Sequence, residues 1–192
     1  MKNCAFWQDK LKFFLMNKIF PYSLSPQNED ERYMLEALKE AWKAFLKDEV
    51  PVGAVLVHAG RIIARGHNQV EMLKDATAHA EMLCLTAGSA ESSEGWRLNE
   101  MTLYCTIEPC TMCAGAMFLS RLGRLVWGAK DLRHGANGSW IDLFDKKHPM
   151  HTVKITNGVY AEIAAEVMKT FFVQKRIEKG TTRDESGYQG IN

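Results

Sequence analysis

Two short motifs, about thirty residues apart, constrain this chain more than any other feature. The first reads His79-x-Glu81 and the second Pro109-Cys110-x-x-Cys113. Together they offer one imidazole, two thiols and one carboxylate, and zinc favours sulfur and nitrogen ligands. Three protein ligands leave the fourth tetrahedral position for water, as in catalytic sites, whereas a fourth residue closes a structural site. We therefore expect one Zn²⁺ per subunit on His79, Cys110 and Cys113, with Glu81 left free.

The local sequence places both motifs at the start of helices. Pro109 suits the first turn of a helix, where its missing N–H costs nothing. Thr77 is the expected cap of a helix over residues 77–86, which puts His79 in the first turn of that helix. Because a helix N-terminus carries partial positive charge, it favours thiolates and hence metal binding. Two helix N-termini are therefore expected to converge on one ion.

Two further cysteines bear on whether the site is open. Cys105 is the nearest candidate for a fourth ligand, but it shares a face of the predicted strand 102–106 with Leu103, so we expect it in the core. The same holds for Cys84, on the helix that follows His79. The five cysteines are odd in number, and two of them form the C-x-x-C motif. This usage favours metal chemistry in a reducing compartment, the cytoplasm, over a disulfide framework.

Apolar periodicity predicts strands that alternate with helices. Helices are expected over residues 30–47, 77–86, 109–122 and 159–179, and strands over residues 53–57, 61–65, 102–106, 125–127 and 152–156. Loops are expected over residues 88–99 and 131–139. The alternation indicates a layered α/β domain, and a length of 192 residues suits one such domain with a full core.

The ends of the chain and its charge differ from this central pattern. Residues 1–27 are basic and aromatic and form an extension of unknown role, with Met16 as an alternative start; residues 181–192 are expected to be a flexible tail. No stretch approaches the roughly 20 apolar residues of a membrane span. Residues 28–100 carry 8 Lys and Arg against 13 Asp and Glu, and residues 121–180 carry 11 against 6. The basic second half indicates either a face for a polyanion or ordinary solvated charge.

The pair of motifs resembles the signature of the zinc nucleobase deaminases, H-x-E followed by P-C-x-x-C. The flanking sequence resembles one branch of them, the tRNA-specific adenosine deaminases, over about residues 29–179. The matching stretches are residues 49–57, 66–68, 77–81, 102–104, 106–110, 112–117, 120–121, 128–131 and 135–139. The resemblance makes residues 28–180 a zinc-dependent deaminase domain. It implies a three-layer α/β/α cytidine-deaminase-like fold with a five-stranded mixed sheet, assembled as a homodimer.

The resemblance also implies a reaction, the hydrolytic deamination of adenosine to inosine at position 34, the wobble position, of a tRNA anticodon. Zinc lowers the pKa of a bound water from 15.7 to about 7. Glu81 would take a proton from this water and return protons to the ring nitrogen and to the leaving amine. The expected partner is a tRNA anticodon loop, that of an arginine tRNA.

Further contacts with the substrate follow from the same resemblance. An asparagine that reads base and ribose matches Asn68, and a position near the neighbouring nucleotide matches Asp131. The C-terminal helix, with Phe171, Phe172 and Arg176, resembles the one that touches the anticodon loop. The helical spacing places one of the two rings in the core and the other at the surface. The expected substrate-binding set is Asn68, Pro51, Val52, Ala80, Ile107, Asp131, Phe171, Phe172 and Arg176.

Two other functions remain open on the sequence. A deaminase of the same fold that acts on a free base or nucleoside, such as guanine or cytosine, would share the zinc ligands and Glu81. A non-catalytic RNA-binding module with structural zinc would instead require a closed site with four ligands.

Overall fold

The computed structural model describes residues 25–92, 95–145, 148–149 and 151–178. Most of the expected N-terminal extension, including Met16, and all of the expected tail over residues 181–192 lie outside the described residues.

The domain is built around one five-stranded mixed sheet with the order β2-β1-β3-β4-β5. Strand β1 pairs antiparallel with both β2 and β3, whereas β3, β4 and β5 run parallel. The strands are β1 (Gly53–His58), β2 (Arg61–His67), β3 (Met101–Ile107), β4 (Arg124–Ala129) and β5 (Lys154–Asn157). All five strands expected from the sequence are present, and the mixed sheet implied by the resemblance is confirmed.

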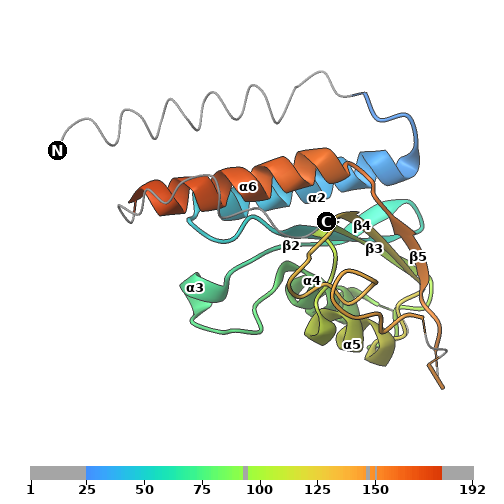
Figure 1. The fold of residues 1–192 in the computed structure, drawn as a ribbon. Coiled ribbons are helices and arrows are strands. Elements are labelled where there is room, and N and C mark those ends of the chain that lie inside the picture. The colour runs from blue at the N-terminus through green and yellow to red at the C-terminus, as the bar shows by residue number, and fades with distance from the viewer. Residues whose placement is uncertain (1–24, 93–94, 146–147, 150, 179–192) are drawn as a thin grey trace.

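Helices cover both faces of the sheet, which gives three layers (Figure 1). Helices α2 (Glu29–Leu46) and α6 (Ala161–Glu178) lie on one face, and α4 (Ala80–Glu91) and α5 (Thr111–Leu119) lie on the other. Since neighbouring side chains of a strand point to opposite faces, Val55 packs with α2 while Leu56 packs with α4. The sheet is therefore buried on both sides, and this explains the apolar runs in β1 and β4.

Helix α2 lies directly against the first residue of β1. A Cβ atom added to Gly53 would lie 2.2 Å from the carbonyl oxygen of Ala37, so only glycine permits this approach. The helix begins at Asn28, whose side chain accepts a hydrogen bond from the N–H of Glu31. Its expected range of 30–47 therefore agrees with the structure to within one residue at each end.

Helices α4 and α5 begin later than the sequence indicates. His79 and Cys110, both with extended backbone, are the residues that precede their first turns. The expected capping role of Thr77 is wrong, because its hydroxyl donates instead to the carboxylate of Asp75 (2.7 Å). Helix α4 also continues to Glu91, through the first residues of the expected loop 88–99, and a short helix α3 (Val70–Leu73) was not expected. No helix in the described part of the chain is long and apolar enough to cross a membrane.

Candidate active site

The starts of α4 and α5 bring one imidazole and two thiols together. The Nδ1 atom of His79 lies 3.6 Å from the Sγ atoms of both Cys110 and Cys113, and the two sulfur atoms are 3.6 Å apart. Ligands placed tetrahedrally around zinc, at about 2.0–2.3 Å from it, are separated by about 3.3–3.8 Å. The three donor atoms thus fit one zinc ion without rearrangement, and the group could bind one zinc.

Hydrogen bonds within this group already favour a negative charge. The pKa of Cys110 is lowered to about 4, chiefly by its side-chain hydrogen bond with Cys113 and further by the one with His79. The same bond to Cys110, together with burial, raises the pKa of Cys113. The bond to Cys110 raises the pKa of His79 as well. Close contact with Cys113 and His79 therefore favours the thiolate form of Cys110, which is the form that binds zinc.

The remaining described cysteines are not part of the metal group. Cys84 donates to the carbonyl oxygen of Ala54 and Cys105 to that of Ile107, each at 3.2 Å, and both lie in the core as expected. Among the residues that the structure describes, no fourth His, Cys, Asp or Glu joins the three ligands. This arrangement leaves one tetrahedral position open and disfavours the closed structural site.

Glu81 lies beside the group but outside the ligand set. It follows His79 by two residues, in the first turn of α4, and is 2% exposed. Its Oε2 atom is buried and has no hydrogen-bond partner within the described chain. Burial raises the pKa of this carboxyl to about 7. A carboxyl of that pKa both takes up and releases a proton near neutral pH, as a general acid–base catalyst must.

Asn68 reaches this end of the sheet directly after β2. Its N–H donates to the carbonyl oxygen of Val52 (3.0 Å), and the next N–H, that of Gln69, donates to the carbonyl oxygen of Ala78 (3.0 Å). The segment after β2 is thereby tied both to the start of β1 and to the residue before His79. Asn68, Val52 and the metal group consequently lie in one neighbourhood.

The other expected pocket residues lie on segments that lead to the same end of the sheet. Pro51 is buried before β1, and Ala80 is fully buried between His79 and Glu81. Val52 and Cys110 are half-buried and pack against the same core cluster. Ile107 is half-buried at the end of β3, three residues before Cys110.

Asp131 follows β4 and shapes its own loop. Its carboxylate accepts hydrogen bonds from the backbone N–H groups of Arg133 (3.0 Å) and His134 (3.2 Å). This is the turn role that a short acidic side chain commonly takes. The same loop returns to the zinc motif, where the N–H of Ala136 donates to the carbonyl oxygen of Pro109 (2.9 Å).

The structure separates the two phenylalanines of α6. Phe171 is 5% exposed and packs edge-on against Phe45 of α2, with ring centroids 5.7 Å apart. Phe172 is 40% exposed, and Arg176 lies one turn further along the helix, also exposed. Phe172 is therefore the surface ring of the pair and Phe171 the core ring.

Two buried carboxylates near the site were not singled out from the sequence. Glu49 accepts hydrogen bonds from the Nδ2 group of Asn68 and from backbone N–H groups at the start of α3, and Glu108 accepts them from the loop that begins at Asp131. Both are 1% exposed. The sequence could have pointed to them because each lies in a stretch that matches the deaminases. There, Glu49 directly precedes Val50 and Glu108 directly precedes Pro109.

Comparison with known proteins agrees with this geometry. Residues 27–129 match the cytidine and deoxycytidylate deaminase zinc-binding region. The tRNA-specific adenosine deaminase of Bacillus subtilis (strain 168) is 44% identical over 155 residues, which are 81% of this chain and 96% of that protein. The chloroplastic tRNA(adenine(34)) deaminase of Arabidopsis thaliana is 50% identical over 159 residues, which are 74% of this chain but only 12% of that larger protein.

A solved structure from a study of A-to-I editing by tRNA:A34 deaminases at the wobble position superposes with a TM-score of 0.67. It is 41% identical in sequence, and the match covers 71% of this chain and 98% of that one. The chain therefore belongs to the cytidine and deoxycytidylate deaminase family, in the branch of the tRNA-specific adenosine deaminases.

Proposed function

We propose that this chain is a zinc-dependent hydrolase that converts adenosine to inosine at the wobble position of a tRNA anticodon. The observation that carries the proposal is the buried carboxylate of Glu81, which lies next to a three-ligand metal group without being one of its ligands. Relatives that are similar over nearly their whole length are tRNA-specific adenosine deaminases.

The chemistry assigns separate tasks to the ligands and to Glu81. His79, Cys110 and Cys113 would hold the zinc, which would supply an activated water when bound. Glu81 accepts a proton as the water oxygen adds to the carbon that bears the amino group. It passes this proton to the adjacent ring nitrogen. It then takes the second proton from the hydroxyl group so formed and passes it to the amine as the carbon–nitrogen bond breaks, so that adenosine and water yield inosine and ammonia. Proton transfer of this kind contributes roughly 10²–10⁴ to the rate.

The base must leave its stack to reach a buried site. We assign Asn68 to hydrogen bonding with the base and ribose of the extruded nucleotide. Pro51, Val52, Ala80 and Ile107 would form the apolar walls around it. Asp131 would face the neighbouring nucleotide, and the loop that it shapes is fastened to the zinc motif.

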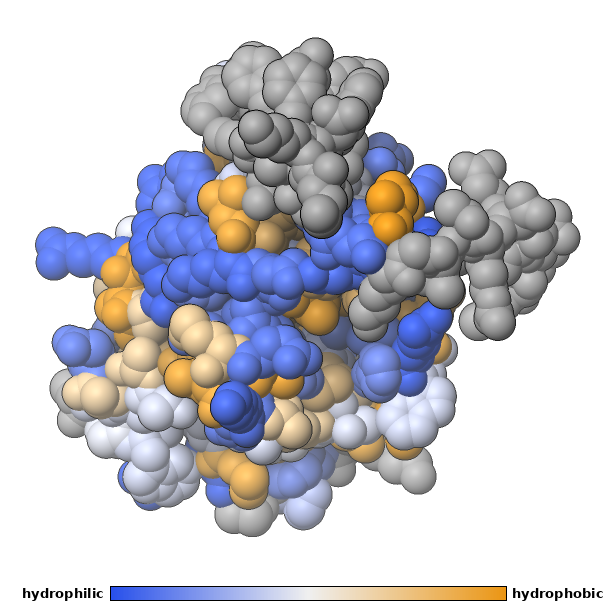
Figure 2. Space-filling model, turned by 90° about the vertical axis from the view of Figure 1, so that its left-hand side faces the viewer, coloured by the Kyte–Doolittle hydropathy of each residue, from blue (hydrophilic) through white to orange (hydrophobic). Residues whose placement is uncertain are grey.

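We place the surface contact with RNA at the C-terminal end of α6. Phe172 offers an exposed ring for base stacking and Arg176 offers a charge for phosphate. Figure 2 views the side of the molecule on which α3 and the ends of α2 and α6 lie. There, hydrophilic residues surround separate hydrophobic patches, a mixture suited to RNA bases and phosphates. An arginine tRNA is the partner that we propose.

We further propose a cytoplasmic homodimer. In support of self-association, Leu119 at the end of α5 is 71% exposed. In support of a reducing compartment, the four described cysteines are free thiols.

One assay tests the reaction and its main rival together. The zinc-loaded chain is incubated with an arginine tRNA transcript and, separately, with guanine and with cytidine. We expect inosine at the first anticodon position and no ammonia from the free base or nucleoside. Ammonia from guanine or cytidine, with an unmodified transcript, would replace this proposal with a deaminase of small substrates.

A further inference from the structure

Glu49 is a buried carboxylate placed between a substrate-reading side chain and the segment beside it. Its Oε2 atom accepts hydrogen bonds from Asn68 Nδ2 (3.1 Å) and from the backbone N–H of Glu71 (3.3 Å), and its Oε1 atom accepts one from the N–H of Met72 (2.7 Å). Both oxygen atoms are thus satisfied. At 1% exposure the carboxylate has no access to a substrate, so any effect on the reaction must pass through its partners.

The bond from Asn68 decides which way the amide of that residue is turned. An asparagine amide offers a carbonyl acceptor on one side and an NH₂ donor on the other, and the two arrangements are related by a half-turn of the group. A carboxylate only accepts hydrogen bonds, so Glu49 forces the NH₂ group toward itself. The Oδ1 atom of Asn68 makes no hydrogen bond within the described chain and is left as an acceptor.

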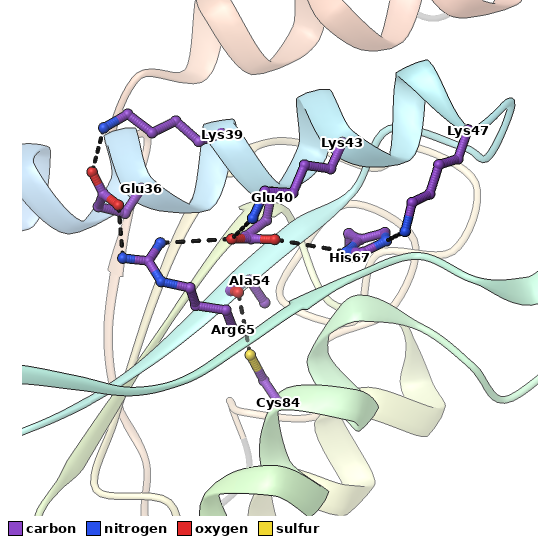
Figure 3. Close-up of polar contacts among 9 residues, drawn as sticks. All are labelled: Glu36, Lys39, Glu40, Lys43, Lys47, Ala54, Arg65, His67 and Cys84. Carbon is purple, nitrogen blue, oxygen red and sulfur yellow. Dashed lines mark hydrogen bonds and ion pairs between the residues drawn. The ribbon is translucent and has the colours of Figure 1, made fainter.

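The backbone at Asn68 is fixed independently, so only its side chain remains to be set. Its N–H is held by Val52, and the preceding residue, His67, pairs with Gly53 across the sheet. The ring of His67 lies between Glu40 and Lys47 (Figure 3), with Nε2 at 3.0 Å from Lys47 Nζ and Nδ1 at 3.6 Å from the carboxylate of Glu40. The main chain of Asn68 is thus fixed by hydrogen bonds with the start of β1, and its side-chain amide is fixed by Glu49.

We propose that Glu49 is a positioning residue for the reaction. It fixes the amide of Asn68 so that Oδ1 accepts a hydrogen bond from a donor group on the target nucleotide. This inference rests on the proposed function, because it takes Asn68 as a residue that reads the substrate. A group that donates to Oδ1, such as a ribose hydroxyl, is then selected over one that only accepts.

A purely structural role of Glu49 is the competing explanation, since it also anchors α3 through Glu71 and Met72. The two roles respond differently to a swap of donor and acceptor. In Glu49→Gln one of the two acceptor oxygens becomes an NH₂ group. In place of Oε1 this group faces only the N–H of Met72, whereas in place of Oε2 it faces the NH₂ of Asn68, and the asparagine amide turns over to relieve the conflict. After this turn, Asn68 presents its NH₂ donor to the substrate in place of its Oδ1 acceptor. In Glu49→Gln with Asn68→Asp, the new carboxylate accepts from Gln and keeps an acceptor oxygen for the substrate.

The experiment measures kcat/KM for inosine formation in the zinc-loaded chain and in three variants, E49Q, N68D and E49Q/N68D. Zinc content and the free energy of unfolding are recorded for each. We expect E49Q to lower kcat/KM about ten- to hundredfold. N68D alone places two carboxylates side by side and should also lose activity, and the double variant should recover about tenfold or more over either single one.

N68D keeps the bonds from Glu49 to α3, so its comparison with the double variant is informative even where E49Q alone folds poorly. The matched control is D30N, another acid-to-amide change. Asp30 binds Arg124, at the start of β4, and Tyr104, which packs with α2 on the face of the sheet opposite α4 and α5. D30N should therefore leave kcat/KM within about twofold of the original.

The possible outcomes distinguish the positioning role of Glu49 from the proposed function of the chain. The positioning role is overturned if the original chain is active but the loss of kcat/KM in the double variant equals the product of the two single losses. The proposed function would survive that result. An original chain that forms no inosine on tRNA overturns the proposed function, and the positioning role with it. Recovery in the double variant, with zinc content and stability unchanged, supports the coupling of Glu49 to Asn68.

Discussion

The carboxylate of Glu108 accepts hydrogen bonds from both the backbone N–H (3.1 Å) and the hydroxyl group of Ser139. It also accepts from the backbone N–H groups of Asn137 (2.8 Å) and Asp131 (3.3 Å). Glu108 stands two residues before Cys110, the first thiol ligand. One buried side chain therefore fastens the loop after β4 to the motif that holds zinc.

Glu108→Gln should loosen this loop. The amide offers one acceptor where the carboxylate offers two, so at least one buried backbone N–H loses its partner. We expect the free energy of unfolding in urea to fall by about 1–3 kcal/mol, and zinc to pass faster to a competing chelator. Ser139→Ala removes only one of the bonds and should cost about 0.5–1.5 kcal/mol. Equal losses in the two variants would show that Glu108 acts only through Ser139.

Glu81→Gln should separate metal binding from turnover. The amide keeps the size of the side chain but cannot take up the proton, and Glu81 is not a ligand. We expect one zinc per chain by elemental analysis and a fall in kcat of roughly 10²–10⁴ on the tRNA substrate. Retained turnover at normal zinc content would remove Glu81 as the proton carrier.

Cys113→Ser and Cys84→Ser form a matched pair of buried thiol substitutions. Cys113 belongs to the metal group, and its loss should abolish stoichiometric zinc and lower the thermal midpoint. Cys84 donates to the carbonyl oxygen of Ala54, and serine preserves that donor, so Cys84→Ser should keep one zinc per chain. Zinc loss in both variants would indicate general unfolding instead of ligand loss.

The pair Asp30–Arg124 predicts a dependence of stability on pH. Hydrogen bonds from Arg124 hold the pKa of the Asp30 carboxyl below its ordinary value of 3.8. The unfolded chain therefore binds the proton first, so this contribution is fully present above that value and is lost as the pH falls through the lower, folded pKa. We expect a shallower loss of unfolding free energy below about pH 5 in Asp30→Asn, measured by urea titration. The difference should shrink in high salt, since the pair is partly exposed.

Local chemistry in the sequence was enough to predict the ligand set and the order of the elements. The spacing of His79, Cys110 and Cys113 indicates a zinc site by itself, because one imidazole and two thiols at such positions have few other uses. The apolar runs in β1 and β4 fit a sheet that is covered on both faces. The five-stranded mixed sheet was expected from resemblance to a family, not from periodicity, and the order and pairing of its strands came only from the structure.

What could not be predicted depends on contacts between distant residues. Nothing near Glu49 or Glu108 in the sequence shows that loops some twenty to thirty residues away donate to them. Thr77 has the local chemistry of a helix cap, and its pairing with Asp75 is equally local, so the choice between the two rests on where α4 packs. The division between Phe171 and Phe172 likewise depends on Phe45 of α2.

Gly66 and Gly115 offer a last matched pair, one at a close approach and one in open space. A Cβ atom added to Gly66 would lie 2.6 Å from the carbonyl oxygen of Ala80, so helix α4, which carries Glu81, would have to shift. Gly66→Ala should therefore lower the free energy of unfolding by about 1–3 kcal/mol and reduce turnover.

Around Gly115, inside α5, nothing lies within 4 Å of an added Cβ atom. Gly115→Ala should raise the free energy of unfolding by about 0.5–1 kcal/mol, because alanine favours helix. Both variants are compared by urea unfolding and by sedimentation. A Gly115→Ala chain that is less stable, and that sediments as a smaller species than the original, would place this helix face in the proposed dimer contact, where small residues allow close packing.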